Sequence, residues 1–320
     1  MKKPNFFIVG FPKCGTSAMY DMLQQHPEVA FSIPGEPRYF CKDLCRESVA
    51  AKPDLWHDPR ELLQPFFCRT EGEYLRCFAH VRDEKAVGDA TVYYLFSKVA
   101  AAEIRAYSPG AKIIIMVREP VDLLHSYHSM LVRGGREPID VFEEALAAEE
   151  DRRNAQRTVQ RGTAHPSELY YSEQVRFTEQ IDRFRRSFPE EQIRIVIYDD
   201  FKNDNVGQCK MALQFLEVDA DHAPQTKIVN PNQVTRLPAL KRLLESELVF
   251  ERMRRAVPPA VYDRGRRLYK RIMFTKAPRP PLPEALRRRL QVRYREEVER
   301  LGQMLDRDLC GLWGYVRESS

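Results

Sequence analysis

An apolar run near the middle of the chain constrains the fold more than any other feature. Residues 112–118 read Lys-Ile-Ile-Ile-Met-Val-Arg, with no polar side chain between the two basic ends. Successive side chains of a strand point to opposite faces of a sheet, so this segment can form a strand only where both faces are covered. Parallel sheets flanked by helices provide that environment. The run therefore predicts an α/β protein.

Other segments extend this pattern along the chain. Further strands are indicated by short runs of β-forming residues at 5–10, 29–31, 86–88 and 194–198. Helical spacing of apolar residues separates some of them, most clearly at 16–25 and 172–188. Because strands that alternate with helices form parallel sheets, we predict a central, mostly parallel sheet of about five strands flanked by helices.

The strand signal fades beyond about residue 205, where helical patterns continue at 211–216, 237–248 and 286–305. A proline cluster at 278–283 predicts an extended connector, because proline cannot continue a helix. We expect one domain over residues 1–320. Residues 5–235 form its α/β core with the ligand site, and residues 236–320 form a basic, mainly helical extension.

Positive charge is concentrated in that extension. Residues 236–300 hold nineteen Lys or Arg against eight Asp or Glu, a local balance of +11 in a chain whose net charge is +5. Two interpretations stay open: solvated helix faces, or a surface that attracts an acidic substrate, a carrier or a membrane. Nucleic acid is a weaker hypothesis, because no recognisable binding module accompanies the charge.

The cysteines and the N-terminus indicate the compartment. Seven cysteines are irregularly spaced, without a Cys-x-x-Cys pair, which argues against a zinc site or a complete disulfide framework. The apolar stretch at 6–11 is too short for a signal peptide or a membrane span. We therefore expect a reduced, cytoplasmic protein without a cleaved leader.

The loop after the first predicted strand has the composition of an anion site. It reads Gly10-Phe-Pro-Lys-Cys-Gly-Thr-Ser17 and leads into a predicted helix, whose first N–H groups and dipole attract anions. Gly15 allows close approach, and Lys13, Thr16 and Ser17 add a cation and two hydroxyls. An ordinary tight turn is the competing interpretation. A nucleoside-triphosphatase loop places its lysine directly after the last glycine, so the position of Lys13 argues against hydrolysis of ATP or GTP.

A second basic element follows the strand at 112–118. Arg118 ends this strand, and Ser126 lies two turns along the helix predicted to begin near Pro120. The guanidinium of Arg118 can bind a phosphate through two N–H groups while Ser126 donates another hydrogen bond.

Together the two elements resemble the PAPS-dependent sulfotransferase family, whose donor is 3'-phosphoadenosine-5'-phosphosulfate (PAPS) and whose product is the bisphosphate PAP. Pro12–Ser17 matches the family's loop for the 5'-phosphosulfate, and Arg118 with Ser126 matches its 3'-phosphate pair. The resemblance implies a P-loop-like sulfotransferase fold and a donor site formed by Lys13, Cys14, Gly15, Thr16, Ser17, Arg118 and Ser126.

Family landmarks extend over nearly the whole chain, at 26–27, 35–40, 88–94 and 305–313, and are nearest to bacterial members related to the heparan-sulfate and carbohydrate type. In related members a glutamate before an aromatic pair acts as the catalytic base, and Glu36 occupies that place. Its role would be to take the proton from the acceptor hydroxyl. A solvated loop carboxylate is the alternative.

Three further residues are assigned on weaker matches. Asp89 stands where the glycosaminoglycan enzymes often carry a lysine, and could contact the acceptor or cap a helix. Tyr171 lies where the family often places an aromatic residue over the substrates. Arg236 is a candidate second phosphate contact, with an exposed surface arginine as the alternative. For His125 and His128 we expect structural roles on their helix.

Lys13 and Glu36 are thus the candidate catalytic residues of a sulfuryl transfer that needs no metal, since a sulfuryl group carries less charge than a phosphoryl group. The acceptor is expected to be a hydroxyl-bearing carbohydrate, lipid or carrier-bound alcohol, and the basic segment favours an anionic one. Two alternatives remain open: a P-loop small-molecule kinase that uses ATP, and an inactive protein that binds an acidic glycan or carrier.

Overall fold

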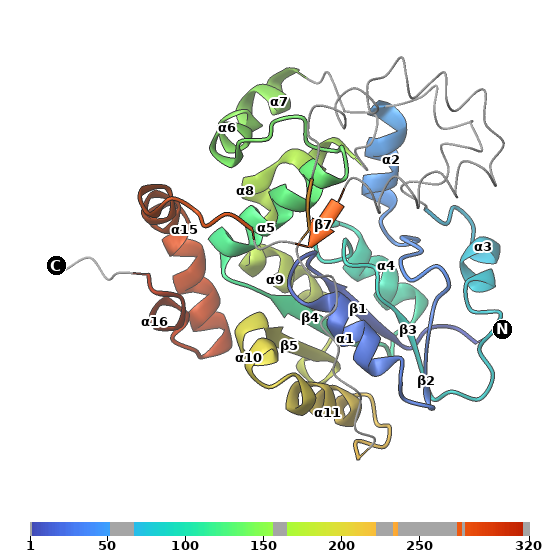
Figure 1. Cartoon of the computed structure of the whole chain (residues 1–320). Coiled ribbons are helices and arrows are strands. Elements are labelled where there is room, and N and C mark those ends of the chain that lie inside the picture. The colour runs from blue at the N-terminus through green and yellow to red at the C-terminus, as the bar shows by residue number, and fades with distance from the viewer. Residues whose placement is uncertain are drawn as a thin grey trace.

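The computed structural model describes residues 2–51, 67–155, 165–221, 233–235, 274–276 and 279–315. At its centre lies a five-stranded parallel sheet with the strand order β2-β3-β1-β4-β5 (Figure 1). The strands are β1 (Phe6–Gly10), β2 (Val29–Phe31), β3 (Ala86–Asp89), β4 (Lys112–Val117) and β5 (Ile193–Ile197). The predicted fold class and all five predicted strands are confirmed.

Helices connect and flank the strands. They are α1 (Thr16–Leu23), α2 (Lys42–Ala51), α3 (Glu71–Arg76), α4 (Ala100–Tyr107), α5 (Pro120–Arg133), α6 (Phe142–Ala147), α7 (Glu149–Ala155), α8 (Tyr171–Gln174), α9 (Phe177–Ser187), α10 (Tyr198–Asn203), α11 (Asn205–Phe215), α15 (Glu284–Leu305) and α16 (Leu309–Trp313). Short 3-10 helices span Pro166–Leu169 and Glu190–Gln192, and β6 (Gln233–Thr235) pairs antiparallel with β7 (Phe274–Lys276).

The path of the chain changes direction between β1 and β4, which makes this a topological switch point of the sheet. After β1 the chain crosses through α1 to β2 on one side of the sheet, whereas after β4 it crosses to β5 on the other side. Right-handed crossovers then put α1 and α5 on opposite faces. The packing agrees, because α1 contacts α11, while α4, α9, α15 and α5 contact one another in series. Ligands of open α/β sheets bind where neighbouring strands diverge in this way, outside their carboxyl ends.

The central strands are buried as their sequences predict. All five residues of β1 are buried, and only Lys112 of β4 is partly exposed. Each fully buried large aliphatic or aromatic side chain contributes about 1.5–3 kcal/mol relative to its exposed state. Strands β1 and β4 are therefore a rigid support for the loops that follow them.

The helix predicted over 172–188 is two helices in the structure. Helix α8 ends at Gln174 and α9 begins at Phe177, because Arg176 has the non-helical angles φ −76° and ψ 59°. The helix predicted at 286–305 and the extended connector before it are confirmed by α15 and the described residues 279–283. The helix predicted at 237–248 lies outside the described residues.

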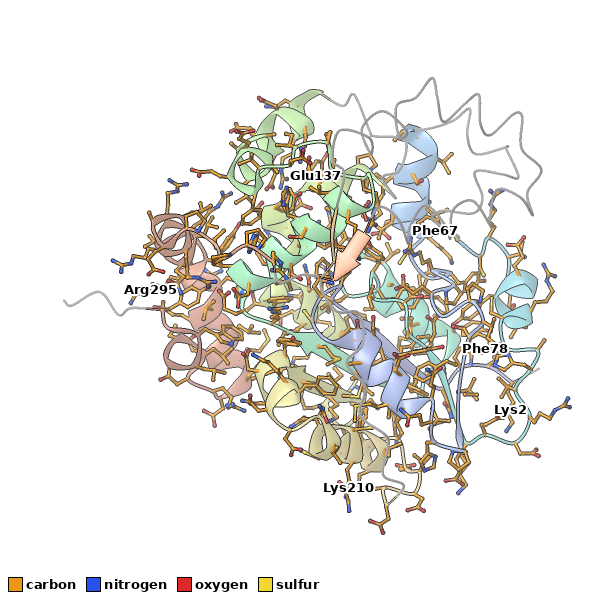
Figure 2. All side chains as sticks on the ribbon, viewed as in Figure 1. Lys2, Phe67, Phe78, Glu137, Lys210 and Arg295 are labelled. Carbon is orange, nitrogen blue, oxygen red and sulfur yellow. The ribbon has the colours of Figure 1, made fainter. Side chains whose placement is uncertain are left out.

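The basic side chains of α15 are largely paired with carboxylates of this chain. Figure 2 shows the side chains of α15, Arg295 among them, along one edge of the molecule. Arg287 forms an ion pair of 2.7 Å with Asp122 of α5, and Arg289 pairs with Glu143. Pairs along the helix itself join Arg288–Glu284, Arg295–Glu299 and Arg300–Glu296. For this helix, the charge pattern matches the interpretation as a solvated face.

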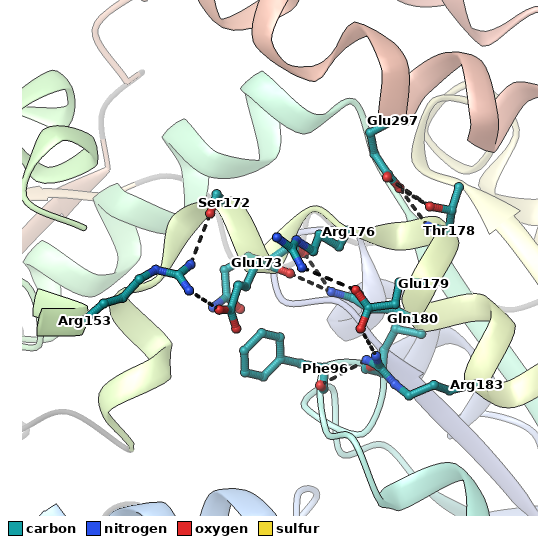
Figure 3. A network of polar contacts seen from close by, with 12 residues as sticks. Phe96, Arg153, Ser172, Glu173, Arg176, Thr178, Glu179, Gln180, Arg183 and Glu297 are labelled. Atoms are coloured by element: carbon teal, nitrogen blue, oxygen red, sulfur yellow. Dashed lines mark hydrogen bonds and ion pairs between the residues drawn. The ribbon is translucent and has the colours of Figure 1, made fainter. Parts of the chain in front are cut away.

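Helix α9 forms polar contacts with α15 and with the segment that follows β3 (Figure 3). The N–H and the hydroxyl of Thr178 donate to Glu297 of α15 at 2.7 and 2.9 Å. Arg183 donates to the carbonyl oxygens of Leu95 and Phe96, just after β3, at 3.1 and 3.2 Å. Helix α15 is thus connected through α9 to the segment that follows β3. Within the described ranges, no helix is long and apolar enough to cross a membrane.

Candidate active site

The loop after β1 turns sharply through two residues with left-handed backbone angles. The β1–β4 register shifts between Ile8 and Gly10, and the N–H of Phe11 then donates to the Met116 carbonyl at 3.0 Å. Lys13 has φ +73° and Gly15 has φ +92°. A lysine in this region is uncommon, so the surrounding contacts must hold it. The side chain of Cys14, between these residues, is fully buried, and burial raises the pKa of its thiol to about 12.

Only glycine fits at position 15, where the loop meets α1. A Cβ atom there would lie 3.1 Å from the Tyr198 ring and 3.3 Å from Phe201, in addition to the strain of a positive φ. The N–H groups of residues 18 and 19 both point to the Gly15 carbonyl. The N–H groups of Thr16 and Ser17, the first residues of α1, therefore have no acceptor within the helix and can bind an anion.

Arg118 joins the end of β4 to this loop. Its Nη1 donates to the Lys13 carbonyl at 3.1 Å, and its guanidinium carbon lies 4.4 Å from the centre of the Tyr198 ring. Its Nη2 lies 3.9 Å from Asp122, one turn along the chain. The structure thus brings the two sequence elements together, and the contact to Lys13 helps hold the unusual backbone of the loop.

Positive charge is crowded at this point. Burial, and then repulsion from Arg133, Arg279 and Arg118, lowers the pKa of Lys13 to about 8. Burial and the charge of Arg118 also lower the pKa of Arg279. Like charges that destabilise one another in this way would be relieved by a bound anion. Lys13, Arg118, Arg133 and Arg279 therefore form one cluster of positive charge beside the loop.

Arg133 and Arg279 were missed by sequence reasoning. Arg133 follows Ser126 by seven residues on α5, a spacing that places both on one helix face and could have been recognised. Arg279 lies in the proline-rich connector, where no local pattern indicates a ligand. Its Nε is buried and has no hydrogen-bond partner in the described part of the chain. Such a donor is costly to bury unless a ligand satisfies it.

The neighbours of Arg133 on α5 have distinct environments. Ser126 is buried on α5, two turns from the start of that helix. Burial and the Arg279 charge lower the pKa of His125 to about 4, so this ring is neutral near pH 7. His128 is hydrogen-bonded through Nε2 to the Ile139 carbonyl at 2.9 Å, which agrees with a structural role. Arg236, the expected second phosphate contact, lies outside the described residues.

Glu36 lies on a loop beside α1 and forms an ion pair. A Cβ added at Gly35 would lie 3.8 Å from Tyr20 of α1, which places the loop next to the helix that follows the anion site. The Glu36 Oε2 atom is 3.0 Å from Nη2 of Arg38, and the two side chains are 39% and 15% exposed. The carboxylate is thus reachable from solvent while its partner is largely covered.

The partner, Arg38, is held by further contacts. Its N–H donates to Thr91 Oγ1 at 3.1 Å, and its guanidinium lies 4.7 Å from the centre of the Tyr93 ring. The Tyr93 hydroxyl donates to the fully buried Glu168 at 2.9 Å, and Glu168 pairs with Arg136. A polar network of alternating charge therefore supports the Glu36 loop.

Asp89 and Tyr171, the expected acceptor contacts, are both fully buried. The Asp89 carboxylate accepts hydrogen bonds from the Tyr74 and Tyr94 hydroxyls at 2.9 and 2.8 Å and from the Thr91 N–H. The Tyr171 hydroxyl donates to Glu137 at 2.8 Å. Both side chains thus have partners within the protein, and Asp89 accepts from the backbone of the turn after β3 rather than capping a helix.

A glycine-containing loop between a strand and a helix, contacted by a strand-end arginine at the point where parallel strands diverge, is typical of α/β proteins that bind ligands at the carboxyl ends of their strands. The comparisons identify the family within that class. A family model described as "Sulfotransferase family" matches residues 4–222, and the chain belongs to this family. A crystal structure of a sulfotransferase from Alicyclobacillus acidocaldarius is 27% identical, with a TM-score of 0.68, over 97% of this chain and 99% of that one.

Curated relatives include carbohydrate-acting members. Human carbohydrate sulfotransferase 15 is 25% identical over 169 residues, a match that covers 45% of this chain and 30% of that protein. Human heparan sulfate glucosamine 3-O-sulfotransferase 6 is 23% identical over 326 residues, or 97% of this chain and 74% of that protein. The chain therefore spans only a third or less of the first relative and most of the second.

Proposed function

We propose that this sulfotransferase transfers a sulfuryl group from 3'-phosphoadenosine-5'-phosphosulfate to a hydroxyl group of its acceptor. The contact between Arg118 and the Lys13 carbonyl carries the proposal, because it joins the loop and the strand-end arginine into one anion site. The donor has phosphate groups at two positions of its nucleotide. In the proposed arrangement, Lys13 and the loop amides take one of these positions and Arg118 with Arg279 takes the other.

Each group of residues has a defined task in the proposed reaction. The N–H groups of Thr16 and Ser17 bind the 5'-phosphate, and Arg118, Ser126 and Arg279 bind the 3'-phosphate. Arg279 is proposed in addition to Arg236, the contact that the sequence suggests, and its buried Nε, which has no hydrogen-bond partner among the described residues, supports this assignment. Lys13 stabilises the negative charge that develops on the departing phosphate oxygen.

Glu36 is the proposed base. The acceptor oxygen attacks sulfur in line with the bridging oxygen, the bond from sulfur to that oxygen breaks, and the carboxylate of Glu36 receives the hydroxyl proton. Arg38 holds the carboxylate through its ion pair, so that little side-chain freedom is lost when the acceptor binds. No metal takes part in this proposed scheme, because a sulfuryl group carries less charge than a phosphoryl group.

The acceptor is proposed to be a carbohydrate or another hydroxyl-bearing molecule. Support comes from the names of the curated relatives, two of which act on carbohydrate or heparan sulfate according to those names. The positive charges of Lys13 and Arg133, which lie close enough to repel each other, would attract an anionic acceptor.

The direct test is transfer of radiolabel from PAPS to a panel of oligosaccharide, lipid and phenolic alcohols, with an acceptor-free reaction as control. We expect labelled product with at least one alcohol and stoichiometric release of PAP. Transfer of labelled phosphate from ATP to an alcohol of the same panel, with no transfer of sulfate from PAPS, would contradict the proposal and favour a kinase.

A further inference from the structure

Two buried cysteines enclose the short helix α3. Cys68 lies just before this helix and Cys77 ends it, and their side chains are 4% and 5% exposed. Their Sγ atoms are only 3.7 Å apart and share a hydrogen bond. A disulfide has an S–S distance of about 2.05 Å, so small side-chain rotations would bring the two sulfurs to bonding distance. Phe67 and Phe78, their neighbours in sequence, lie on the side of the molecule occupied by α3 (Figure 2).

The backbones of the same two cysteines hold the loop that carries Glu36. The N–H of Cys68 donates to the Pro37 carbonyl at 2.9 Å, and the Cys77 carbonyl accepts from the N–H of Ile33 at 2.9 Å. Residues 33–37 are therefore anchored at one end by Cys68 and at the other by Cys77. A covalent bond between the cysteines would connect the two anchors directly.

We propose that Cys68 and Cys77 form a redox modification site, in which oxidation by a hydroperoxide closes a disulfide that fixes both anchors of the 33–37 loop. This inference concerns the thiol pair and does not depend on the identity of the sulfuryl donor.

The reaction balances with the hydroperoxide as the oxidant. The Cys77 sulfur attacks the terminal peroxide oxygen, the O–O bond breaks, and a sulfenic acid forms together with an alcohol, or with water from hydrogen peroxide. The Cys68 sulfur then attacks the Cys77 sulfur and displaces water. We take Cys77 as the first nucleophile, because its hydrogen bond with Cys68 lowers the pKa of the Cys77 thiol.

Peptide mapping tests whether the bond forms. Arginines at positions 60, 69, 76 and 82 let trypsin release Cys68 in the peptide 61–69 and Cys77 in the peptide 77–82. The folded full-length protein is treated with hydrogen peroxide, its remaining thiols are alkylated under denaturing conditions, and it is digested without reductant. We expect the two peptides to be linked to each other and to separate after reduction. Recovery of both peptides alkylated, or of Cys77 as a sulfinic acid without a link, would overturn the proposal.

Hydrogen exchange tests whether the bond fixes the loop. Oxidation should slow exchange several-fold at the amides of Ile33 and Cys68, the two donors that anchor it. Cys209→Ala, a change at a buried cysteine of α11, should still show the link and the slowing. Cys77→Ala, or Cys77→Ser if the alanine variant does not fold, should lose both. A linked wild-type protein with unchanged exchange at these amides would overturn the role assigned to the bond.

Discussion

We call the groups around Lys13 the proposed donor side and those around Glu36 the Glu36 side, and the two differ in how charge is paired. On the proposed donor side, burial and then repulsion from Arg133, Arg279 and Arg118 lower the pKa of Lys13 to about 8. On the Glu36 side acidic and basic groups are paired, as in Glu36–Arg38 and Glu168–Arg136. A bound anion would relieve the repulsion around Lys13. Around Glu36 the ion pairs already neutralise one another and hold their side chains in place.

The largest effect should come from removing the donor-side cation nearest the departing phosphate. Lys13→Ala should lower turnover by about 10²–10³-fold, the range for one transition-state donor. Lys13→Arg is the control, because it keeps the charge and the backbone contact at this position. Both are compared by transfer from labelled PAPS at saturating donor. A Lys13→Ala enzyme with turnover within a few-fold of the wild type would remove this contrast between the two sides.

Glu36→Gln tests the other side. Turnover should fall by about 10²-fold or more, because the amide cannot accept the hydroxyl proton. PAP affinity should remain within about twofold, since the ion pair with Arg38 contributes nothing to the anion site. Glu71→Gln, a change at an exposed carboxylate of α3, serves as the matched control and should alter neither quantity. Full turnover of the Glu36 variant would dismiss it as the base.

A smaller effect is expected from Arg279. Arg279→Ala should weaken PAP binding by about tenfold, the value of one charge-assisted hydrogen bond. Arg288→Ala, at an exposed arginine nearby on α15, should leave binding unchanged because it pairs with Glu284 outside the cluster. Calorimetry of PAP with both variants measures this directly. Equal affinities for the two would place Arg279 outside the donor site.

The mildest change is the pH dependence of PAP binding. Free Lys13 has a pKa lowered to about 8, and a bound anion raises it, so binding above pH 8 takes up a proton. Affinity should therefore fall by up to about tenfold per pH unit above that value, and this group adds no slope below it. Lys13→Arg remains charged and should flatten the profile. The same slope in both proteins would assign the proton to another group.

Much of the fold could be predicted from local patterns. A short, uninterrupted apolar run such as 113–117 favours a buried strand, and the structure contains all five strands at the expected places. The contact of the Lys13 loop with Arg118 could also be predicted, because both follow the ends of neighbouring parallel strands. The position of Arg279 beside Lys13 and Arg118 could not be predicted, because it depends on how the extended connector packs, and no local sequence pattern indicates that packing.

Burial was the other property that the sequence did not reveal. Asp89 and Tyr171 are fully buried, because the Tyr74 and Tyr94 hydroxyls pair with the Asp89 carboxylate and Glu137 pairs with the Tyr171 hydroxyl. The contact of Cys68 with Cys77 was likewise hidden, because a spacing of nine residues brings two thiols together only when a short helix folds between them.

The central claim is that the donor side is built for a nucleotide with phosphates at two positions. Titration calorimetry of the wild-type protein with PAP, and separately with ATP and magnesium, tests it most directly. The account predicts one PAP per chain, with affinity that is reduced in the Arg118→Ala variant, and much weaker binding of ATP. Tight binding of ATP with magnesium and none of PAP would contradict it.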